Sequence, residues 1–252
     1  MTRPVLWHFT FSHFAEKARW AFDWKGIPHV RRALLPGAHY PRVWWLSGQG
    51  MVPVLRLDGR VVADSTAIIA ALEHWRPEPA LYPRDAAERR RALALEEFFD
   101  EELGHYLRRF FMALGFAEPD GARLGAAVFA SGHGAAASAT VRLGYPLMRR
   151  FLCWRFDITA ASAAFARGKV LAALDRVEAE LQPSGYLVGD RFSVADLTAA
   201  ALLWPLVDPP DFPYPAPLPP TAAFRRALGD RPALHWVAEM YRRHRAPAPV
   251  AT

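Results

Sequence analysis

Two short motifs in the first third of the chain have residue types suited to holding a small peptide. Val52-Pro53 begins an apolar run, and a proline at the start of a strand has no N–H to give to the sheet. A cis peptide bond there would leave the Val52 backbone able to pair with an extended ligand. Asp64-Ser65 begins an apolar helical run, and a helix start favours an anionic group. Together these motifs predict a cradle for a small acidic peptide.

The elements around the two motifs follow from the same stretch of sequence. Asp58-Gly59 is a dipeptide typical of a two-residue hairpin turn, and it lies between two short apolar runs. Upstream, residues 4–9 predict a strand, 12–26 a helix and 27–34 a second strand. Residues 35–50 are expected to form a long loop that contains a short helix. The predicted order is β-α-β-α-β-β-α, which is the thioredoxin-like order.

Val52-Pro53-Val54-Leu55, followed at this spacing by Asp64-Ser65-Thr66-Ala67-Ile68, resembles the glutathione-binding half of the glutathione S-transferase superfamily. That family joins a thioredoxin-like domain to an all-helical domain. The resemblance implies that the residue before the cis-proline pairs with the cysteinyl part of glutathione and that the acid-Ser pair holds its γ-glutamyl end. It thus assigns glutathione binding to Val52, Pro53, Asp64 and Ser65, with glutathione as co-substrate and no metal.

Ser12 is the candidate catalytic residue. Ser12-His13-Phe14-Ala15 is similar to the Ser-Pro-Phe and Cys-Pro-Phe-Ala patterns of the family, with His13 in place of the proline. The resemblance implies that the Ser12 hydroxyl donates to the glutathione sulfur, and the positive helix end favours a thiolate. The alternative is that Ser12 only caps the helix. Neither position 12 nor 15 is a cysteine, so thiol–disulfide exchange is not expected.

Several residues are candidates for holding the glycyl end of glutathione. The family commonly has a basic or amide residue directly before the Val-Pro pair, and here that residue is Met51. His39, Gln49 or Arg42 could replace it. His13 could contact a substrate, although a single histidine beside a helix cap is more often a surface side chain.

The second half of the chain has few strand signals. The proline-rich residues 77–84 predict a linker between a glutathione-binding domain, 1–76, and an all-helical substrate-binding domain, 85–252. The pattern predicts helices over 86–114, 141–156, 162–181, from 194 to 207 and over 224–245, with a break at 229–232 and loops over 115–138 and 208–220. Most aromatic side chains between Phe98 and Phe111 are expected in the core.

Ser193 and Asp196 have the spacing of a capping box ahead of the helix that ends at 207. The family has this arrangement at the matching place, where it is structural, so neither residue is expected to be catalytic.

Composition narrows the function classes. The net charge of +6 is compatible with a nucleic-acid partner, but the sequence contains no nucleic-acid-binding motif. The Arg89-Arg90-Arg91 run is followed by alternating acidic residues, which indicates a solvated helix face. The only cysteine, Cys153, cannot form an intrachain disulfide and is expected to be buried. There is no secretory signal pattern and no apolar run of membrane-spanning length, so we expect a cytoplasmic protein that binds neither nucleic acid nor membrane.

The resemblance therefore implies a homodimeric glutathione S-transferase-like enzyme of detoxification. It would stabilise the thiolate of glutathione or a related thiol and conjugate it to an apolar electrophile, or perform a related isomerisation or dehalogenation. The alternative is a non-catalytic glutathione-transferase-like module that binds a ligand or a partner protein. Ser12, Asp64 and Ser65 favour the enzyme, whereas Met51 and the missing cysteine favour the module.

Overall fold

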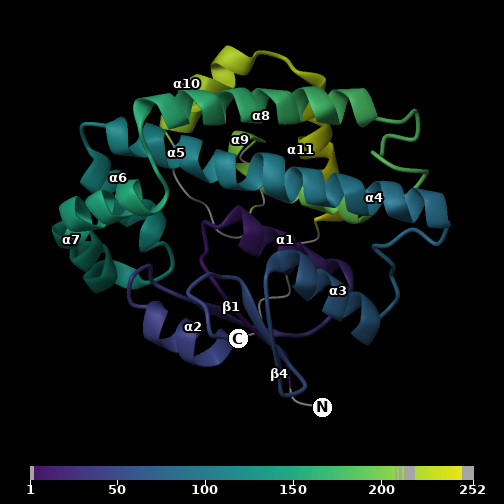
Figure 1. The fold of residues 1–252 in the computed structure, drawn as a ribbon, viewed down its shortest axis with the longest axis horizontal. Coiled ribbons are helices and arrows are strands. Elements are labelled where there is room, and N and C mark those ends of the chain that lie inside the picture. Colours follow the sequence, from purple (N-terminus) through teal and green to yellow (C-terminus); the bar gives the residue numbers. More distant parts are fainter. Residues whose placement is uncertain (1–2, 208, 210–211, 213–218, 246–252) are drawn as a thin grey trace.

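The computed structural model describes residues 3–207, 209, 212 and 219–245. The first domain is a four-stranded mixed sheet with strand order β2-β1-β3-β4 and with helices packed on it (Figure 1). Its elements are β1 (Val5–His8), α1 (His13–Trp24), β2 (Val30–Ala33), α2 (Tyr40–Ser47), β3 (Val54–Leu57), β4 (Arg60–Ala63) and α3 (Ser65–Trp75). The predicted order β-α-β-α-β-β-α is confirmed, although β2 is shorter than the predicted 27–34.

Strand pairing confirms the predicted hairpin. β1 pairs in parallel with β2 and antiparallel with β3, and β3 pairs antiparallel with β4. Asp58 and Gly59 connect β3 to β4, and both have positive φ angles, of 46° and 82°. A two-residue turn of this kind needs positive φ at both positions, which is why Asp-Gly is favoured there.

The second domain is helical. Its elements are α4 (Ala86–Phe99), the π-helix η1 (Asp100–Gly104), α5 (His105–Ala117), α6 (Gly121–Phe129), α7 (Gly134–Arg155), α8 (Ala160–Glu180), α9 (Val194–Val207), α10 (Pro219–Leu228) and α11 (Pro232–His244). Figure 1 shows α8 running alongside the rod formed by α4 and α5, with α9 enclosed between the helical layer and α1. Every residue of α9 up to Leu206 is buried. One hydrophobic core therefore runs from the sheet through α1 into α9 and its neighbours.

Three of the predicted helix boundaries need correction. The predicted helix over 86–114 is present, but the π-helix interrupts it. The predicted loop over 115–138 is wrong, because it contains α6 and the beginning of α7. The predicted break at 229–232 is confirmed, but the helix before it begins at Pro219 rather than 224. The predicted loop over 208–220 lies largely outside the described residues.

Ser193 and Asp196 have the structural role that the sequence predicts. Asp196 Oδ2 accepts hydrogen bonds from the Ser193 N–H (2.9 Å) and hydroxyl (2.8 Å), and Oδ1 accepts from the Leu187 N–H (2.8 Å). The serine hydroxyl thus donates to the carboxylate instead of accepting from the helix backbone, which differs from a full capping box. Burial raises the pKa of Asp196 to about 6. This buried carboxylate joins the segment before α9 to the helix itself.

No helix within the described ranges is long and apolar enough to cross a membrane. Arg89-Arg90-Arg91 is exposed, as the sequence predicts.

Candidate active site

A cavity of about 1290 Å³ lies between the two domains. Its walls come from the loop between β1 and α1, the residues before β3, the start of α3, and the helices from α4 to α7. Eight of the residues singled out from the sequence line it, and Arg42 does not: Ser12, His13, His39, Gln49, Val52, Pro53, Asp64 and Ser65. Their convergence on one cavity is an observation, and the role of each remains a prediction.

Ser12 is the N-cap of α1. Its Oγ accepts a hydrogen bond from the Ala15 N–H at 3.2 Å, so the capping interpretation holds. Because the oxygen is the acceptor in that bond, its own O–H can still donate to a second group. Ser12 also lines the cavity, so capping and donation to a ligand are compatible.

Val52 and Pro53 precede β3 and are joined by a cis peptide bond, as predicted. The pairing of β3 with β1 begins at Val54, opposite Trp7, so Val52 lies beyond the end of the ladder. The Val52 side chain is buried with Trp7 and Val43. This packing fixes the position of the segment, and both Val52 and Pro53 line the cavity.

Asp64 is the N-cap of α3 and has a backbone that non-glycine residues rarely adopt. Its φ is 83°, and its Oδ1 accepts from the N–H groups of Thr66 (2.9 Å) and Ala67 (3.1 Å). Such strained conformations concentrate at ligand sites. Ser65, the first residue of the helix, is buried against the cavity.

A buried ion cluster behind the start of α3 was missed by the sequence reasoning. Lys17 Nζ lies 2.8 Å from Glu96 Oε1 and 2.5 Å from Asp100 Oδ2, and it donates to Thr66 Oγ1 at 2.7 Å. Burial raises the pKa of Glu96, against the opposing effect of Lys17. Asp100 Oδ1 is buried and has no hydrogen-bond partner within the described part of the chain. This end of the cavity therefore favours a positively charged ligand group.

His39 is already engaged by the loop that carries it. Its Nδ1 accepts from the Gly37 N–H and its Nε2 donates to the Gly50 carbonyl, each at 3.1 Å. Both ring nitrogens are thus used in holding this loop.

Gln49 holds the backbone of Met51 in a similar way. Its amide nitrogen donates to the Met51 carbonyl at 2.8 Å, and its amide oxygen accepts from the Met51 N–H. Arg42, the third candidate for the glycyl end, lies over the Trp7 ring at 5.8 Å and does not line the cavity.

The expectation that His13 is a surface side chain is wrong. Only 6% of it is exposed, and its Nε2 donates to the carbonyl of Gly104, the last residue of the π-helix, at 3.0 Å. Burial, reinforced by Arg108, lowers the pKa of His13 to about 3. The residue after Ser12 is therefore a neutral imidazole at neutral pH.

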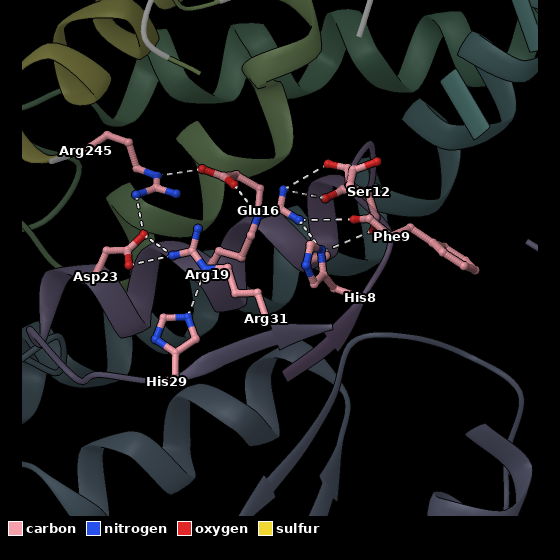
Figure 2. A network of polar contacts seen from close by, with 11 residues as sticks. His8, Phe9, Ser12, Glu16, Arg19, Asp23, His29, Arg31 and Arg245 are labelled. Carbon is pink, nitrogen blue, oxygen red and sulfur yellow. Dashed lines mark hydrogen bonds and ion pairs between the residues drawn. The ribbon is translucent and has the colours of Figure 1, made fainter. Parts of the chain in front are cut away.

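A second buried charge network supports the loop that carries Ser12 (Figure 2). Arg19 donates to the carbonyls of Phe9 (3.1 Å) and Thr10 (3.3 Å) and to Glu16 (2.8 Å). Glu16 in turn accepts from Arg245, which follows α11, at 2.7 Å. The sequence signal that could have shown this network is the placement of charged residues on buried positions of α1.

The other half of the cavity is mostly apolar and is formed by α5, α6 and α7. Its lining includes Phe111, Leu124, Phe129, Leu147, Met148 and Phe151. Phe99 and Phe110 are buried in the core, as predicted, whereas Phe111 faces this cavity. Cys153 is half-buried against a smaller hydrophobic cluster and not fully buried as expected. Within the described residues there is no group of three potential ligands able to hold a metal ion.

Comparison with known proteins identifies the family. The glutathione S-transferase N-terminal domain model matches residues 6–80, and the C-terminal domain model matches residues 143–232. The chain belongs to the glutathione S-transferase superfamily. Among solved structures it is similar to the β-etherase LigF from Sphingobium sp. strain SYK-6, with a TM-score of 0.63 and 22% identity over 94% of this chain and 99% of the other.

Relatives in the glutathione S-transferase superfamily differ in function. FtsZ-localized protein A of Caulobacter vibrioides (strain NA1000 / CB15N) is 26% identical over 203 residues, which is 79% of this chain and 75% of that protein. Maleylpyruvate isomerase of a Ralstonia species is 37% identical over 93 residues, which is 36% of this chain and 44% of that enzyme. Membership in the superfamily therefore fixes the fold and leaves the activity to be argued from the site.

Proposed function

We propose that the protein is a glutathione S-transferase that binds glutathione or a related thiol in this cavity and conjugates it to an apolar electrophile. The observation that supports this most directly is that Ser12, Val52 and Ser65 line one cavity whose other half is apolar. One half suits an extended polar peptide, and the other suits an apolar substrate held next to its sulfur.

The charges of the cavity fit the parts of glutathione. The γ-glutamyl carboxylate would accept from the start of α3 at Ser65, where helix N–H groups favour an anion. Its ammonium would face Asp64 and the unpaired oxygen of Asp100. The cysteinyl backbone would pair with Val52, which places the sulfur near Ser12.

In the proposed reaction the thiol loses its proton to solvent, the Ser12 hydroxyl donates a hydrogen bond to the resulting thiolate sulfur, and the N-terminus of α1 adds a positive field. Lowering a thiol pKa from about 9 towards neutrality corresponds to ~3 kcal/mol, which one charge-assisted hydrogen bond and a helix end can supply. The thiolate then forms a sulfur–carbon bond with the electrophile, and the leaving group departs with the bonding electron pair.

The proposal is tested by glutathione affinity and by turnover of 1-chloro-2,4-dinitrobenzene. We expect Ser12→Ala to bind glutathione with little change in Kd but to turn over about 10- to 100-fold more slowly, because one hydrogen bond to a charged sulfur is lost. Ser138→Ala, on α7 and outside the cavity, serves as the matched control. Equal turnover by wild type and Ser12→Ala would contradict the role of Ser12.

A non-catalytic function is the second candidate. It is favoured by the similarity to FtsZ-localized protein A along 79% of the chain and by Met51, which offers no charge for the glycyl carboxylate. Under this alternative, glutathione binds without turnover of any electrophile. If calorimetry detects no binding of a low-molecular-weight thiol, the cradle instead serves a protein partner.

We further propose that the protein is a cytoplasmic homodimer involved in detoxification. Four large apolar side chains of α7, at steps of four and three residues, are exposed, and two of them, Leu147 and Phe151, also line the edge of the cavity: Leu143, Leu147, Phe151 and Trp154. Such a stripe is costly in water and suits burial against a second copy. Light scattering should give twice the chain mass, and Leu143→Glu should shift the equilibrium towards the monomer. A monomeric wild type would contradict this proposal.

A further inference from the structure

Two arginines line the apolar half of the cavity. Arg108 lies on α5 and Arg155 ends α7, and they are the only lysine or arginine residues among the described residues that line the cavity. The Arg108 guanidinium carbon lies 4.3 Å from the centroid of the Phe156 ring, and that of Arg155 lies 5.2 Å from it. Two helices thus bring two positive charges to one aromatic ring in the cavity wall.

Neither arginine has an acidic partner among the residues that the structure describes. The ion pairs found in the described part of the chain include no pair with Arg108 or Arg155. Arg108 Nη2 lies 3.2 Å from His105 Nδ1, but Nε is buried and has no hydrogen-bond partner among the described residues. A buried cation without a partner is costly, and an anion that binds beside it removes that cost.

The pKa of Arg108 also indicates that its surroundings are positively charged. Burial, followed by the charges of Arg155 and Arg109, lowers the pKa of Arg108 to about 10. The side chain therefore remains protonated at neutral pH. The charges that lower this pKa, those of Arg155 and Arg109, are both positive, so they repel the Arg108 guanidinium.

The acidic side chains that line the cavity come from the start of α3, from α4 and from the π-helix, and none of them forms an ion pair with Arg108 among the described residues: Asp64, Glu96, Glu97, Asp100 and Glu101. The charges of Glu101 and Asp100 act on His105, the neighbour of Arg108. The charge of Arg108 also reaches His13, next to Ser12, as the second cause of its lowered pKa after burial. An anion held by Arg108 would therefore lie close to the reacting sulfur.

We propose that the electrophile accepted by this site carries a carboxylate, which Arg108 and Arg155 bind beside the face of Phe156. Guanidinium groups match the planar geometry of a carboxylate and can bind it through paired hydrogen bonds. The rest of the substrate is apolar and unsaturated or aromatic, since Phe111, Phe129 and Phe151 surround it. This inference rests on the proposed thiol transfer and specifies its substrate class.

A matched pair of substrates tests the preference: 4-chloro-3,5-dinitrobenzoate and its neutral amide. The kcat/KM of each compound is divided by the rate constant of its uncatalysed reaction with glutathione. This correction removes the difference in intrinsic reactivity between the two compounds. We expect wild type to favour the benzoate by at least about 10-fold after this correction. Arg108→Gln should lower the value for the benzoate about 10- to 100-fold and leave that for the amide within about 3-fold.

Arg150→Gln is the control, because Arg150 lies on α7 with Arg155 but does not line the cavity. It should leave the preference unchanged. If Arg108→Gln slows both substrates equally, Arg108 acts on the sulfur or on the fold, and the proposal is wrong. A wild-type protein that turns over both compounds equally would also overturn it.

A binding measurement without thiol separates this inference from the proposed reaction. Calorimetry should show 4-nitrobenzoate binding at least about 10-fold more tightly than 4-nitrobenzamide, with the difference lost in Arg108→Gln. If that result appears in a protein without turnover, the anion site stands and the proposed thiol transfer fails. Equal affinity of wild type for the two compounds would overturn the anion site.

Discussion

Four histidines of the first domain are buried with a lowered pKa: His8, His13, His29 and His39. Burial is the first cause in each case, and it lowers the pKa of His13 to about 3, that of His29 to about 4 and that of His8 well below its ordinary value. Between these values and the ordinary histidine value near 6.5, the unfolded chain binds protons that the folded chain does not. The contribution of these histidines to the free energy of unfolding is therefore largest above about pH 6.5. It decreases as the pH falls below that value.

The residue with the clearest consequence is His13. Its shift predicts a loss of about 3 kcal/mol of folding free energy between pH 6.5 and about pH 4.5. In His13→Gln that part of the loss should disappear, because glutamine can donate to the Gly104 carbonyl but does not titrate. Urea unfolding at pH 7 and at about pH 4.5 measures the difference.

Wild type is the reference for this comparison. If His13→Gln has the same pH dependence as wild type, the buried neutral state of His13 is contradicted.

Individual residues were predictable where their signal is local. Val52, Pro53, Asp64 and Ser65 belong to motifs whose spacing is set by a hairpin and a helix start, and the structure brings them to one cavity. The charged contacts were not predictable, because they join distant segments. His13 contacts a residue 91 positions away, and Glu16 contacts one 229 positions away.

At the scale of elements, the largest error concerns α6 and the start of α7. Glycine, alanine and serine are frequent there, and glycine disfavours a helix, so the composition indicates a loop. The structure shows why glycine is present. Tyr145 of α7 packs against α6 at Gly121 and Gly125, where a Cβ would lie 2.4 Å and 2.7 Å from its side chain. Close helix packing, which no local pattern shows, explains the two glycines.

This packing predicts that Gly125→Ala destabilises the protein by about 1–3 kcal/mol, because the new methyl group would displace the ring of a buried tyrosine. Thermal or urea unfolding of the variant measures the loss. Gly168→Ala, inside α8, is the control, since its Cβ meets nothing within 4 Å. That variant should be more stable than wild type by up to about 1 kcal/mol. Equal effects of the two substitutions would contradict the packing.

At the scale of the whole molecule, the network of Arg19, Glu16 and Arg245 ties the end of α11 to the loop of Ser12 (Figure 2). Opposing effects act on Glu16. Burial raises its pKa, but the two arginines outweigh burial, so the net shift is downward. The folded protein therefore contains a buried carboxylate between two buried guanidinium groups.

Removing that carboxylate should be costly. Glu16→Gln removes the buried carboxylate that Arg19 and Arg245 share, while Arg245 keeps its ion pair with Asp23. We expect a loss of up to about 3–5 kcal/mol in the free energy of unfolding. Any folded fraction should also have a raised KM for glutathione, since Arg19 positions the carbonyls before Ser12. Glu239→Gln, which breaks an exposed cluster on α11, should change stability little. A Glu16→Gln protein as stable as wild type would show that the network contributes no support.

The central claim is that Ser12 stabilises a thiolate in the shared cavity, and a titration of bound glutathione tests it most directly. The ultraviolet absorbance of the thiolate, followed against pH, gives the pKa of the bound thiol. We predict a value near neutrality for wild type, compared with about 9 for the free thiol, and a value higher by about 1–2 pH units for Ser12→Ala. A bound thiol that titrates at its free value in wild type, or identically in both proteins, would contradict the account.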